Sequence, residues 1–471
     1  MYKVEIIQNG QRIAVRVEKG TLLSSVLIEN STAAEHLCGC KGLCKKCTVF
    51  VKGKSELSCQ YIIDSDICVE VPEKSDIESV TGMEESDKLT DNVCLCFDIG
   101  TTSLALALVS LDEHRIIGTV TKSNPQRIFG ADVMSRIDYS TKCGTAQLHN
   151  TVIAALNQMI NELLKRFGLK ETENLYVAGN TAMLHLFFGI DCSSMGVSPY
   201  TPSFLESKTV KAENLGIKRI KHIISLPGIS AFVGSDIVAG LGFIGFSKNG
   251  KYNLLIDLGT NAEVVLFSDN KILCTAAAAG PCFEGANISC GMSASKGAIY
   301  EYSDEGYSVI GNTEPCGICA TGLINVIAAL IETEVVDETG YMECGVYRLT
   351  ENVSITQKDI RQFQLAKSAV YSAVITLMNK AEISFDDIEN MYVSGGFSGK
   401  MNISDAVKTG LLPGELKNKF TPINNSSLLG TVKYAYEKNN FSVFTENAEY
   451  VDLSADVLFG ELFIENMLFQ Q

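Results

Sequence analysis

Apolar and polar residues alternate along two short segments at the start of the chain, residues 2–7 and residues 12–17. Alternation with a period of two is typical of strands that bury one face of a sheet. The segments are separated by Asn9 and Gly10, a pair that two-residue hairpin turns favour. A third apolar run follows at residues 47–51. These patterns predict a small sheet that begins with a β-hairpin.

Two longer apolar patterns are repeated later in the chain. An apolar run that ends at Asp98 continues through Gly-Thr-Thr into a second apolar run, and residues 253–267 echo this order. Residues 175–180 are echoed by residues 391–396. Because both echoes occur in the same order, they indicate a duplicated unit, and we expect two related α/β lobes.

The length of 471 residues exceeds what one hydrophobic core usually supports. An acidic stretch with few apolar residues, which cannot bury enough surface to fold alone, separates the first sheet from the repeats. We predict a first domain at residues 1–74, a flexible linker at 75–92, lobe I at 93–250, and lobe II with a C-terminal segment at 251–471. Within lobe II, helical spacing of apolar residues predicts a core helix over 360–381.

Composition narrows the class of protein. The chain is 46% hydrophobic and 20% charged, with a formal net charge of −16. A strongly acidic chain is repelled by nucleic acid and by anionic membrane surfaces, so we expect neither as a partner. The sequence shows no signal peptide or long apolar span, and its 16 cysteines are scattered as in a reducing compartment. These features predict a cytoplasmic location.

Four cysteines near the start carry the first candidate chemistry: Cys38, Cys44, Cys47 and Cys59. The first three have the spacing C-x5-C-x2-C, and the glycines between them allow backbone amides to turn toward bound sulfide. This loop resembles the [2Fe–2S] loop of plant-type and adrenodoxin-type ferredoxins. The resemblance implies an α+β ferredoxin domain of the β-grasp type that carries electrons.

Two other interpretations of these cysteines remain open. Structural zinc usually takes two separated C-x2-C pairs, and this cluster contains only one. Disulfides need an oxidising compartment, which the scattered cysteines argue against. Cys40 is an extra thiol inside the loop, and we interpret it as a bystander.

The two Asp-x-Gly-Thr turns carry the second candidate chemistry. A glycine removes the Cβ, so backbone N–H groups and threonine hydroxyls can approach phosphate oxygens while the carboxylate faces a metal ion. A hairpin with a capping aspartate is the alternative for either turn alone. The predicted phosphate-binding residues of both turns are Gly100, Thr101, Thr102, Gly259, Thr260 and Asn261.

With these turns the chain resembles the acetate and sugar kinase, Hsc70 and actin superfamily. Residues 393–398 resemble its adenosine motif. The resemblance implies a two-lobed α/β actin-like ATPase fold that binds ATP and Mg²⁺ between its lobes. It also implies that Asp98 and Asp257 hold Mg²⁺ largely through water, and that Gly395, Gly396 and Phe397 belong to the nucleotide site.

A ferredoxin domain followed by such an ATPase is similar to the reductive activators of corrinoid proteins. Further segments that resemble this family are residues 177–183, 279–286 and 291–294. The resemblance implies ATP-dependent reduction of Co(II) corrinoid to Co(I), a corrinoid protein of a methyltransferase system as partner, an upstream low-potential electron donor, and a homodimer. The sequence leaves the particular corrinoid protein open. We also expect no room for the extra middle domain that longer family members carry.

Several candidates have two interpretations. Glu263 is a catalytic base or an exposed strand residue. Glu284 contacts nucleotide or partner, or belongs to a structural turn. Asn180 and Thr181 line the cleft or begin a helix. Two rival functions also remain: another ATP-driven low-potential electron-transfer activator, and a redox-sensing scaffold whose conformation is set by nucleotide.

Overall fold

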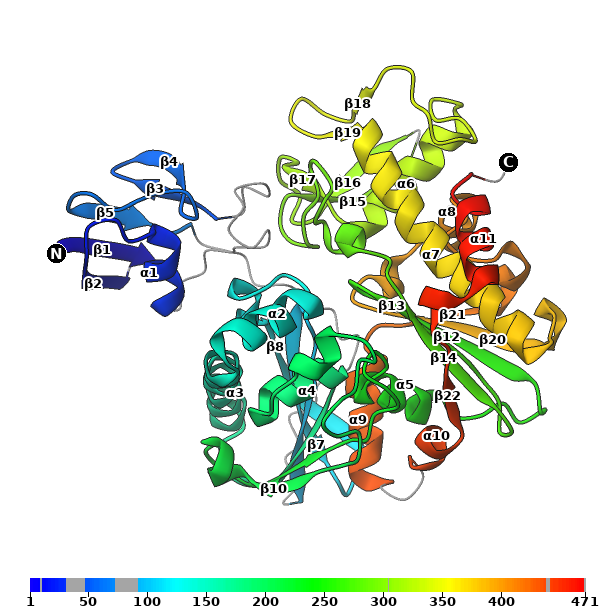
Figure 1. The fold of residues 1–471 in the computed structure, drawn as a ribbon, viewed down its shortest axis with the longest axis horizontal. Helices are drawn as coiled ribbons and strands as arrows, with labels where there is room; N and C mark the ends of the chain where they lie inside the picture. Colours follow the sequence, from blue (N-terminus) through cyan, green and yellow to red (C-terminus); the bar gives the residue numbers. More distant parts are fainter. Residues whose placement is uncertain (9–10, 31–46, 73–91, 304, 438–440, 470–471) are drawn as a thin grey trace.

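The computed structural model describes residues 1–469 except 9–10, 31–46, 73–91, 304 and 438–440. Figure 1 shows a small N-terminal sheet unit on one side and two larger α/β lobes on the other. Of the predicted linker, 75–91 lies outside the described residues. No helix in the described part of the chain is long and apolar enough to cross a membrane.

The N-terminal unit is a mixed sheet covered by a short helix, α1 (Leu23–Glu29). The strand order is β2-β1-β5-β3-β4, and β1 pairs antiparallel with β2 and parallel with β5. This is the β-grasp arrangement, and it confirms the predicted hairpin strands, although Asn9 and Gly10 lie outside the described residues. The strands are β1 (Tyr2–Gln8), β2 (Gln11–Val17), β3 (Thr48–Val51), β4 (Lys54–Leu57) and β5 (Ile67–Glu70).

Lobe I is built on a sheet with the strand order β10-β11-β9-β6-β7-β8. Its first three strands in sequence form an antiparallel meander, and β6 pairs in parallel with β9, which pairs in parallel with β11. The strands are β6 (Val93–Ile99), β7 (Ser103–Ser110), β8 (Arg115–Ser123), β9 (Thr172–Gly179), β10 (Thr209–Lys211) and β11 (Ile220–Ser225).

Lobe II repeats this arrangement with the strand order β21-β20-β12-β13-β14-β22. Its meander is β12-β13-β14, and β12 pairs in parallel with β20, which pairs in parallel with β21. The strands are β12 (Tyr252–Leu258), β13 (Ala262–Phe267), β14 (Ile272–Ala277), β20 (Ile388–Ser394), β21 (Phe420–Ile423) and β22 (Ala448–Tyr450).

The two sequence echoes are neighbouring strands in each lobe. Asp98 pairs with Ala178 across β6 and β9, and Asp257 pairs with Ser394 across β12 and β20. Both Gly-Thr turns lead into a second strand, as expected. The predicted pair of related α/β lobes is therefore confirmed.

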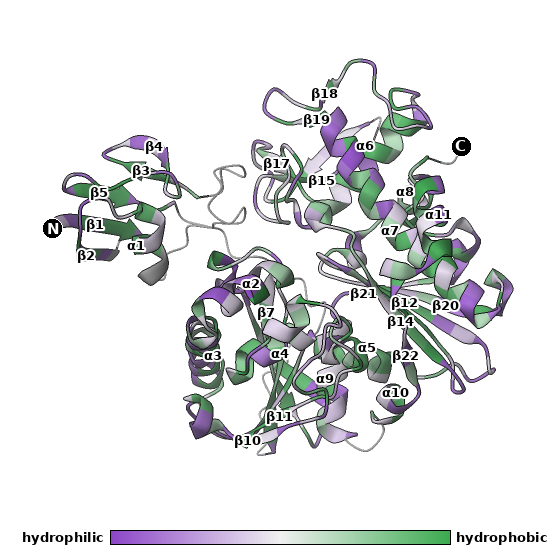
Figure 2. Ribbon diagram, in the orientation of Figure 1, coloured by the Kyte–Doolittle hydropathy of each residue, from purple (hydrophilic) through white to green (hydrophobic). Residues whose placement is uncertain are grey.

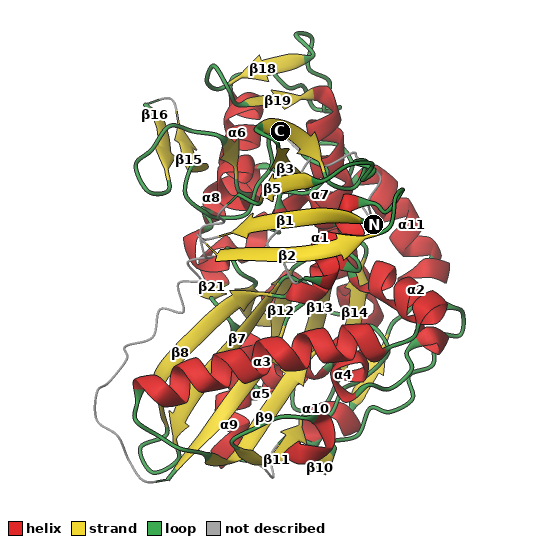
Figure 3. Ribbon diagram, turned by 90° about the vertical axis from the view of Figure 1, so that its left-hand side faces the viewer, coloured by secondary structure: helices red, strands yellow, loops and turns green. Residues whose placement is uncertain are grey.

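Helices cover the outer faces of both sheets. Figure 3 shows α3 lying across the strands of lobe I. The predicted core helix is α7, which starts three residues earlier than expected. The outer helices are α2 (Val133–Cys143), α3 (Ala146–Arg166), α4 (Thr181–Phe188), α6 (Ala320–Glu332), α7 (Gln357–Ala381), α8 (Ile403–Lys408) and α11 (Val457–Glu465). The short helix α10 (Val443–Glu446) packs against α5 (Ser235–Ile244) in the core between the sheets.

Lobe II also carries short strands beside α6 and α7. They form two small sheets, with the orders β16-β15-β17 and β18-β19. Their bounds are β15 (Ala298–Ser303), β16 (Gly306–Val309), β17 (Gly317–Ile318), β18 (Val346–Arg348) and β19 (Ser354–Thr356).

Two helices, α5 (Ser235–Ile244) and α9 (Ser426–Tyr436), share one hydrophobic core with both central sheets. Figure 2 shows α5 as hydrophobic along most of its length, which fits a helix that is covered on all sides. The helices cross at Gly430, where an added Cβ would lie 1.8 Å from the carbonyl oxygen of Ala239. The lobes are therefore joined by two closely packed helices whose N-termini start at the ends of strands.

Candidate functional site

The first Gly-Thr turn is held by side chains from three other segments of lobe I. Asn124 Nδ2 donates to Gly100 O over 2.8 Å, and Asn180 Nδ2 donates to Thr101 Oγ1 over 3.1 Å. The guanidinium of Arg136 donates to Thr101 O. Because both backbone carbonyls point into the protein and are bonded, the turn is a rigid platform.

The second turn has an unpaired donor. Gly259 N–H bonds to Asn261 O over 2.9 Å, which closes the turn. Thr260 Oγ1 is buried and has no hydrogen-bond partner within the described residues. An orphaned buried hydroxyl is costly unless a ligand satisfies it. The turn therefore suits a phosphate oxygen.

The N-terminus of α9 lies between the two aspartates. Ser427 Oγ donates to Asp98 Oδ1 over 2.7 Å, and Asn425 Nδ2 donates to Asp98 Oδ2 over 3.0 Å. Ser426 and Ser394 hydrogen-bond to Asp257. Each aspartate is thus oriented by hydroxyl or amide donors rather than by a cationic partner.

Burial and neighbouring carboxylates shift the pKa values of the acidic residues around Asp98 and Asp257. Burial, followed by the charges of Asp257 and Asp98, raises the pKa of Asp236 to about 7. Burial raises the pKa of Asp257 to about 6, against hydrogen bonds that lower it. Burial also raises the pKa of Asp98, while its hydrogen bonds lower it. For Glu263, burial and the charges of Asp236 and Asp257 raise the pKa well above its ordinary value. These carboxylates form one electrostatically coupled group, the acidic cleft.

The acidic cleft combines one predicted residue of the first repeat, Asp98, and two of the second, Asp257 and Glu263, with one residue that the sequence analysis missed. Glu263 lies directly opposite Asp257 on β13, and its role as a catalytic base stays a prediction. Asp236 was missed because it stands in the first turn of α5, where an acidic residue is ordinarily explained by the helix dipole. A possible signal was the position of Gly234 and Ser235 directly before an apolar helical run.

Mg²⁺ fits this cleft through water. Carboxylate oxygens are the ligands that Mg²⁺ prefers, and it usually keeps several waters. Within the part of the chain that the structure describes, no three Asp, Glu, His or Cys side chains are placed to hold a metal ion directly. The carboxylates are nevertheless close enough to shift one another's pKa values. The predicted water-mediated role of Asp98 and Asp257 is compatible with both observations.

The two glycines of the third motif have different surroundings. A Cβ on Gly395 would lie 2.4 Å from Leu258 O, so Gly395 allows β20 to approach the second turn. A Cβ on Gly396 would meet nothing within 4 Å, so its backbone faces open space that a ligand can occupy. Phe397 packs inward, with its ring 5.7 Å from that of Phe283.

A cavity of about 560 Å³ begins directly after this motif. It is lined by the 399–402 segment, by residues of α6 and by β15. The Lys400 ammonium lies 5.9 Å from the centre of the Tyr300 ring, and Asn325 donates to Asp405 over 2.7 Å. An aromatic ring, an amide and a cation around one cavity suit a heterocyclic ligand.

Two of the predicted cluster ligands lie together in the N-terminal unit. The Cys47 and Cys59 sulfur atoms are 3.2 Å apart, and both side chains are buried. A disulfide has an S–S distance of about 2.05 Å, so Cys47 and Cys59 are not joined to each other by a disulfide. Cys38, Cys40 and Cys44 lie outside the described residues. The described pair fits an iron–sulfur ligand set, in which thiolates converge on adjacent irons.

The remaining candidates have structural roles. Asn180 caps α4 by accepting from Met183 N–H over 2.9 Å, and it also contacts Thr101, so both interpretations of Asn180 hold. Thr181 donates to Ser230 O over 2.6 Å.

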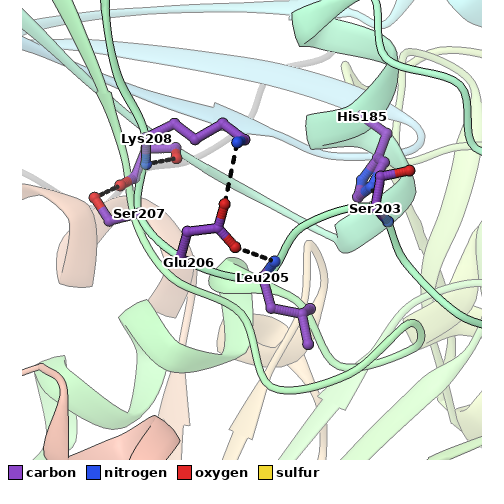
Figure 4. A network of polar contacts seen from close by, with 7 residues as sticks. His185, Ser203, Leu205, Glu206, Ser207 and Lys208 are labelled. Atoms are coloured by element: carbon purple, nitrogen blue, oxygen red, sulfur yellow. Dashed lines mark hydrogen bonds and ion pairs between the residues drawn. The ribbon is translucent and has the colours of Figure 1, made fainter.

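His185 is a core histidine. Its Nδ1 lies 2.7 Å from Thr181 O, and its Nε2 accepts from Ser203 N–H over 3.0 Å. Figure 4 shows the ring beside Ser203, next to the segment that carries the Glu206–Lys208 ion pair. Both ring nitrogens are therefore used within lobe I, and His185 is not available as a metal ligand.

These observations define a class: a ferredoxin-like unit joined to a two-lobed nucleotide-binding protein of the actin-like fold. Residues 251–471 match the family model described as the C-terminal domain of RACo, the ASKHA domain. Residues 93–249 match the model described as the RACo middle region. The chain belongs to the RACo family. The middle-region match coincides with lobe I, and the expectation that the chain has no room for an extra middle domain stays a prediction.

Individual relatives agree with this assignment. The chain is 29% identical over 418 residues to the corrinoid activation enzyme RamQ of Eubacterium limosum, covering 80% of this chain and 70% of that protein. It is 27% identical over 395 residues to a Co(II) methylated amine-specific corrinoid protein reductase of Methanosarcina barkeri, and the match covers 76% of this chain and 72% of that protein. A solved structure of a reductive activator for corrinoid, iron-sulfur protein superposes with a TM-score of 0.72 and 26% identity. The match covers 100% of this chain and 98% of that chain.

Proposed function

We propose that this protein is an ATP-dependent reductive activator that converts the inactive Co(II) form of a corrinoid protein to Co(I). The observation that carries the proposal is the presence in one chain of a buried pair of adjacent cysteines in a ferredoxin-like unit and an acidic cleft with two Gly-Thr turns. The names of the relatives support the same activity. When bound, a [2Fe–2S] cluster supplies one electron to cobalt, and MgATP supplies the free energy for an uphill transfer.

The residues of the N-terminal unit hold the cluster in this proposal. Cys47 and Cys59 are two of its ligands, and Cys38 and Cys44 are proposed as the other two. Burial of the described pair excludes water from two of the sulfur atoms. The proposed domain division, at residues 1–74, 75–92, 93–250 and 251–471, lets this unit move relative to the lobes.

The residues of the cleft bind and orient the nucleotide. The hydroxyl of Thr260 and the N–H groups of both turns donate to phosphate oxygens, and Asp98 and Asp257 orient the waters around Mg²⁺. Gly396 allows the backbone to approach the nucleoside, and the cavity beside Lys400 receives its base.

Asp236 is the residue that we propose as general base for hydrolysis, in place of Glu263. A pKa of about 7 lets Asp236 accept a proton from water near neutral pH. Burial and the charges of Asp236 and Asp257 raise the pKa of Glu263 well above its ordinary value, which favours its protonated form. We assign Glu263 a hydrogen-bonding role beside Asp257.

Anaerobic absorbance spectroscopy tests this function. A candidate corrinoid protein in the Co(II) state is mixed with this protein and a reductant, with and without MgATP. We expect loss of the Co(II) spectrum only with MgATP, and no loss with Asp257→Asn or Cys47→Ser. Asp269→Asn, in an exposed hairpin of lobe II, and Cys143→Ser, an exposed thiol of lobe I, are the matched controls.

The way in which this experiment fails would distinguish the two rival functions. Nucleotide binding without turnover, across all corrinoid proteins tried, would favour the scaffold. ATP turnover that drives reduction of a substrate other than cobalt would favour another low-potential activator. We further propose a cytoplasmic homodimer that receives electrons from an upstream low-potential donor, and light scattering of the purified protein measures its oligomeric state.

A further inference from the structure

A hydrogen bond joins the two lobes at the first Gly-Thr turn. Thr102 Oγ1 in lobe I donates to Glu284 Oε1 in lobe II over 2.7 Å. The same hydroxyl lies in the turn that we propose for phosphate binding. In this structure, a carboxylate therefore occupies a donor that a phosphate oxygen would use.

The backbone around Glu284 fixes the direction of its side chain. Glu284 ends a short 3₁₀ turn, Pro281–Glu284, which is flanked by Gly280 and Gly285, both with φ of 76°. A Cβ on Gly285 would lie 2.5 Å from Met292 N, so this glycine is required by close packing as well as by its conformation. This geometry sets the direction in which the Glu284 side chain leaves the backbone.

The residue before Glu284 connects this turn to the third motif. Phe283 is buried, and its ring lies 5.7 Å from the ring of Phe397. The ring of Phe283 also lies 5.9 Å from the ring of Phe363 in α7. A displacement of Glu284 would therefore be transmitted directly to the segment that borders the proposed nucleoside cavity.

The charges around Glu284 make it a competitor for phosphate. Its carboxylate interacts electrostatically with Glu263 in the acidic cleft and with the buried guanidinium of Arg136. Arg136 already donates to Gly130 O and Thr101 O and is held beside the first turn. A terminal phosphate at Thr102 would meet the repulsion of Glu284 and the attraction of Arg136, so binding favours departure of the glutamate.

We propose that Glu284 is a nucleotide-sensing residue: it bonds to Thr102 when the cleft is empty, the terminal phosphate displaces it, and Phe283 passes the displacement to Phe397. The proposal rests on the proposed function, since it needs a phosphate at the first turn. Glu284 is a positioning residue in this scheme. It couples arrival of phosphate in lobe I to a rearrangement in lobe II.

Calorimetry with a non-hydrolysable ATP analogue and Mg²⁺ gives the first test. Glu284→Gln keeps an oxygen acceptor for Thr102 but removes the charge, and we expect it to bind the analogue about tenfold more tightly than wild type. Glu343→Gln, an exposed carboxylate of the same lobe, is the matched control and should not change affinity.

Hydrogen exchange of residues 278–292 gives a second readout that a structural role alone would not move. In wild type we expect the analogue to speed exchange in this segment, and in Glu284→Gln we expect fast exchange already without it. Unchanged or weaker binding by Glu284→Gln, with a wild type that binds normally, overturns this inference and leaves the proposed function standing. A wild type that binds no nucleotide overturns both.

Discussion

Ser427 donates a hydrogen bond of 2.7 Å to Asp98, although 329 positions separate the two residues in the chain. The bond connects the start of α9 to the end of β6, and it lowers the pKa of a carboxylate whose burial raises it. The ionisation of the first aspartate is thus controlled by a residue from the far end of the sequence.

Removing this donor should shift the pH dependence of the ATPase. In Ser427→Ala the pKa of Asp98 rises, because a hydrogen bond to the charged form is lost. We expect the acid limb of the pH–rate profile to move to higher pH by up to about one unit. Ser427→Thr keeps a hydroxyl and should retain the wild-type profile. An unchanged profile in Ser427→Ala would show that ionised Asp98 does not limit the reaction.

Asp236→Asn should stabilise the nucleotide-free protein while stopping turnover. The raised pKa means that the folded protein binds more protons than the unfolded chain between about pH 4 and 7. The free energy of unfolding therefore rises as pH falls through this range, and a penalty remains above pH 7. At pH 8 we expect Asp236→Asn to add about 1 kcal/mol, seen as a higher melting temperature.

The same melting experiment contains its own control. Asp269→Asn should leave the melting temperature nearly unchanged at both pH 6 and pH 8. Added MgCl₂ should stabilise wild type more at pH 8 than at pH 6, because the cleft carboxylates are ionised there. A lower melting temperature for Asp236→Asn at pH 8 would contradict a destabilising charge at this position.

Gly430→Ala should weaken the joint between the lobes. The new Cβ would lie 1.8 Å from Ala239 O, so α5 and α9 would have to separate. Overpacking of this kind costs about 1–3 kcal/mol, which denaturant unfolding measures. Gly460→Ala on α11 is a matched control, since its Cβ would meet nothing within 4 Å, and it should be neutral or slightly stabilising. Equal effects of both variants would argue against a tight crossing.

His185 should make lobe I sensitive to acid. Burial lowers its pKa below the ordinary 6.5, and Nε2 must stay unprotonated to accept from Ser203 N–H. The unfolded chain therefore binds more protons than the folded protein near pH 6, and the free energy of unfolding falls as pH drops below about 6.5. His185→Asn should be less stable at pH 8 but lose less between pH 7 and pH 5.

The surface histidine His222 provides the comparison. It is exposed and lies 3.8 Å from Glu173, so His222→Asn should keep the steep wild-type loss of stability below pH 6.5. If His185→Asn and wild type lose stability in parallel, another group is responsible for the acid sensitivity.

Local patterns predicted the elements that local physics controls. Alternation identified the strands before and after the Gly-Thr turns, because side chains on a strand alternate between two faces. The cysteine spacing pointed to Cys47 and Cys59, which lie together in the structure. The two aspartates at strand ends were found because the turn after each strand has its own sequence pattern. The duplicated motifs, which occur in the same order in each half, then predicted two related lobes.

Contacts between distant segments could not be found in this way. Asp236 resembles any acidic residue in a first helical turn, and Asn425 and Ser427 resemble an ordinary helix start. Glu284 was a candidate, but no local pattern indicated its bond to Thr102. Their roles depend on how α5, α9 and the Pro281–Glu284 turn pack between two sheets. The sequence alone determined which strands and turns form, since period and glycine sterics act over a few residues. Only the tertiary structure decided which carboxylates share the cleft, because burial and repulsion between carboxylates depend on how distant segments pack side by side.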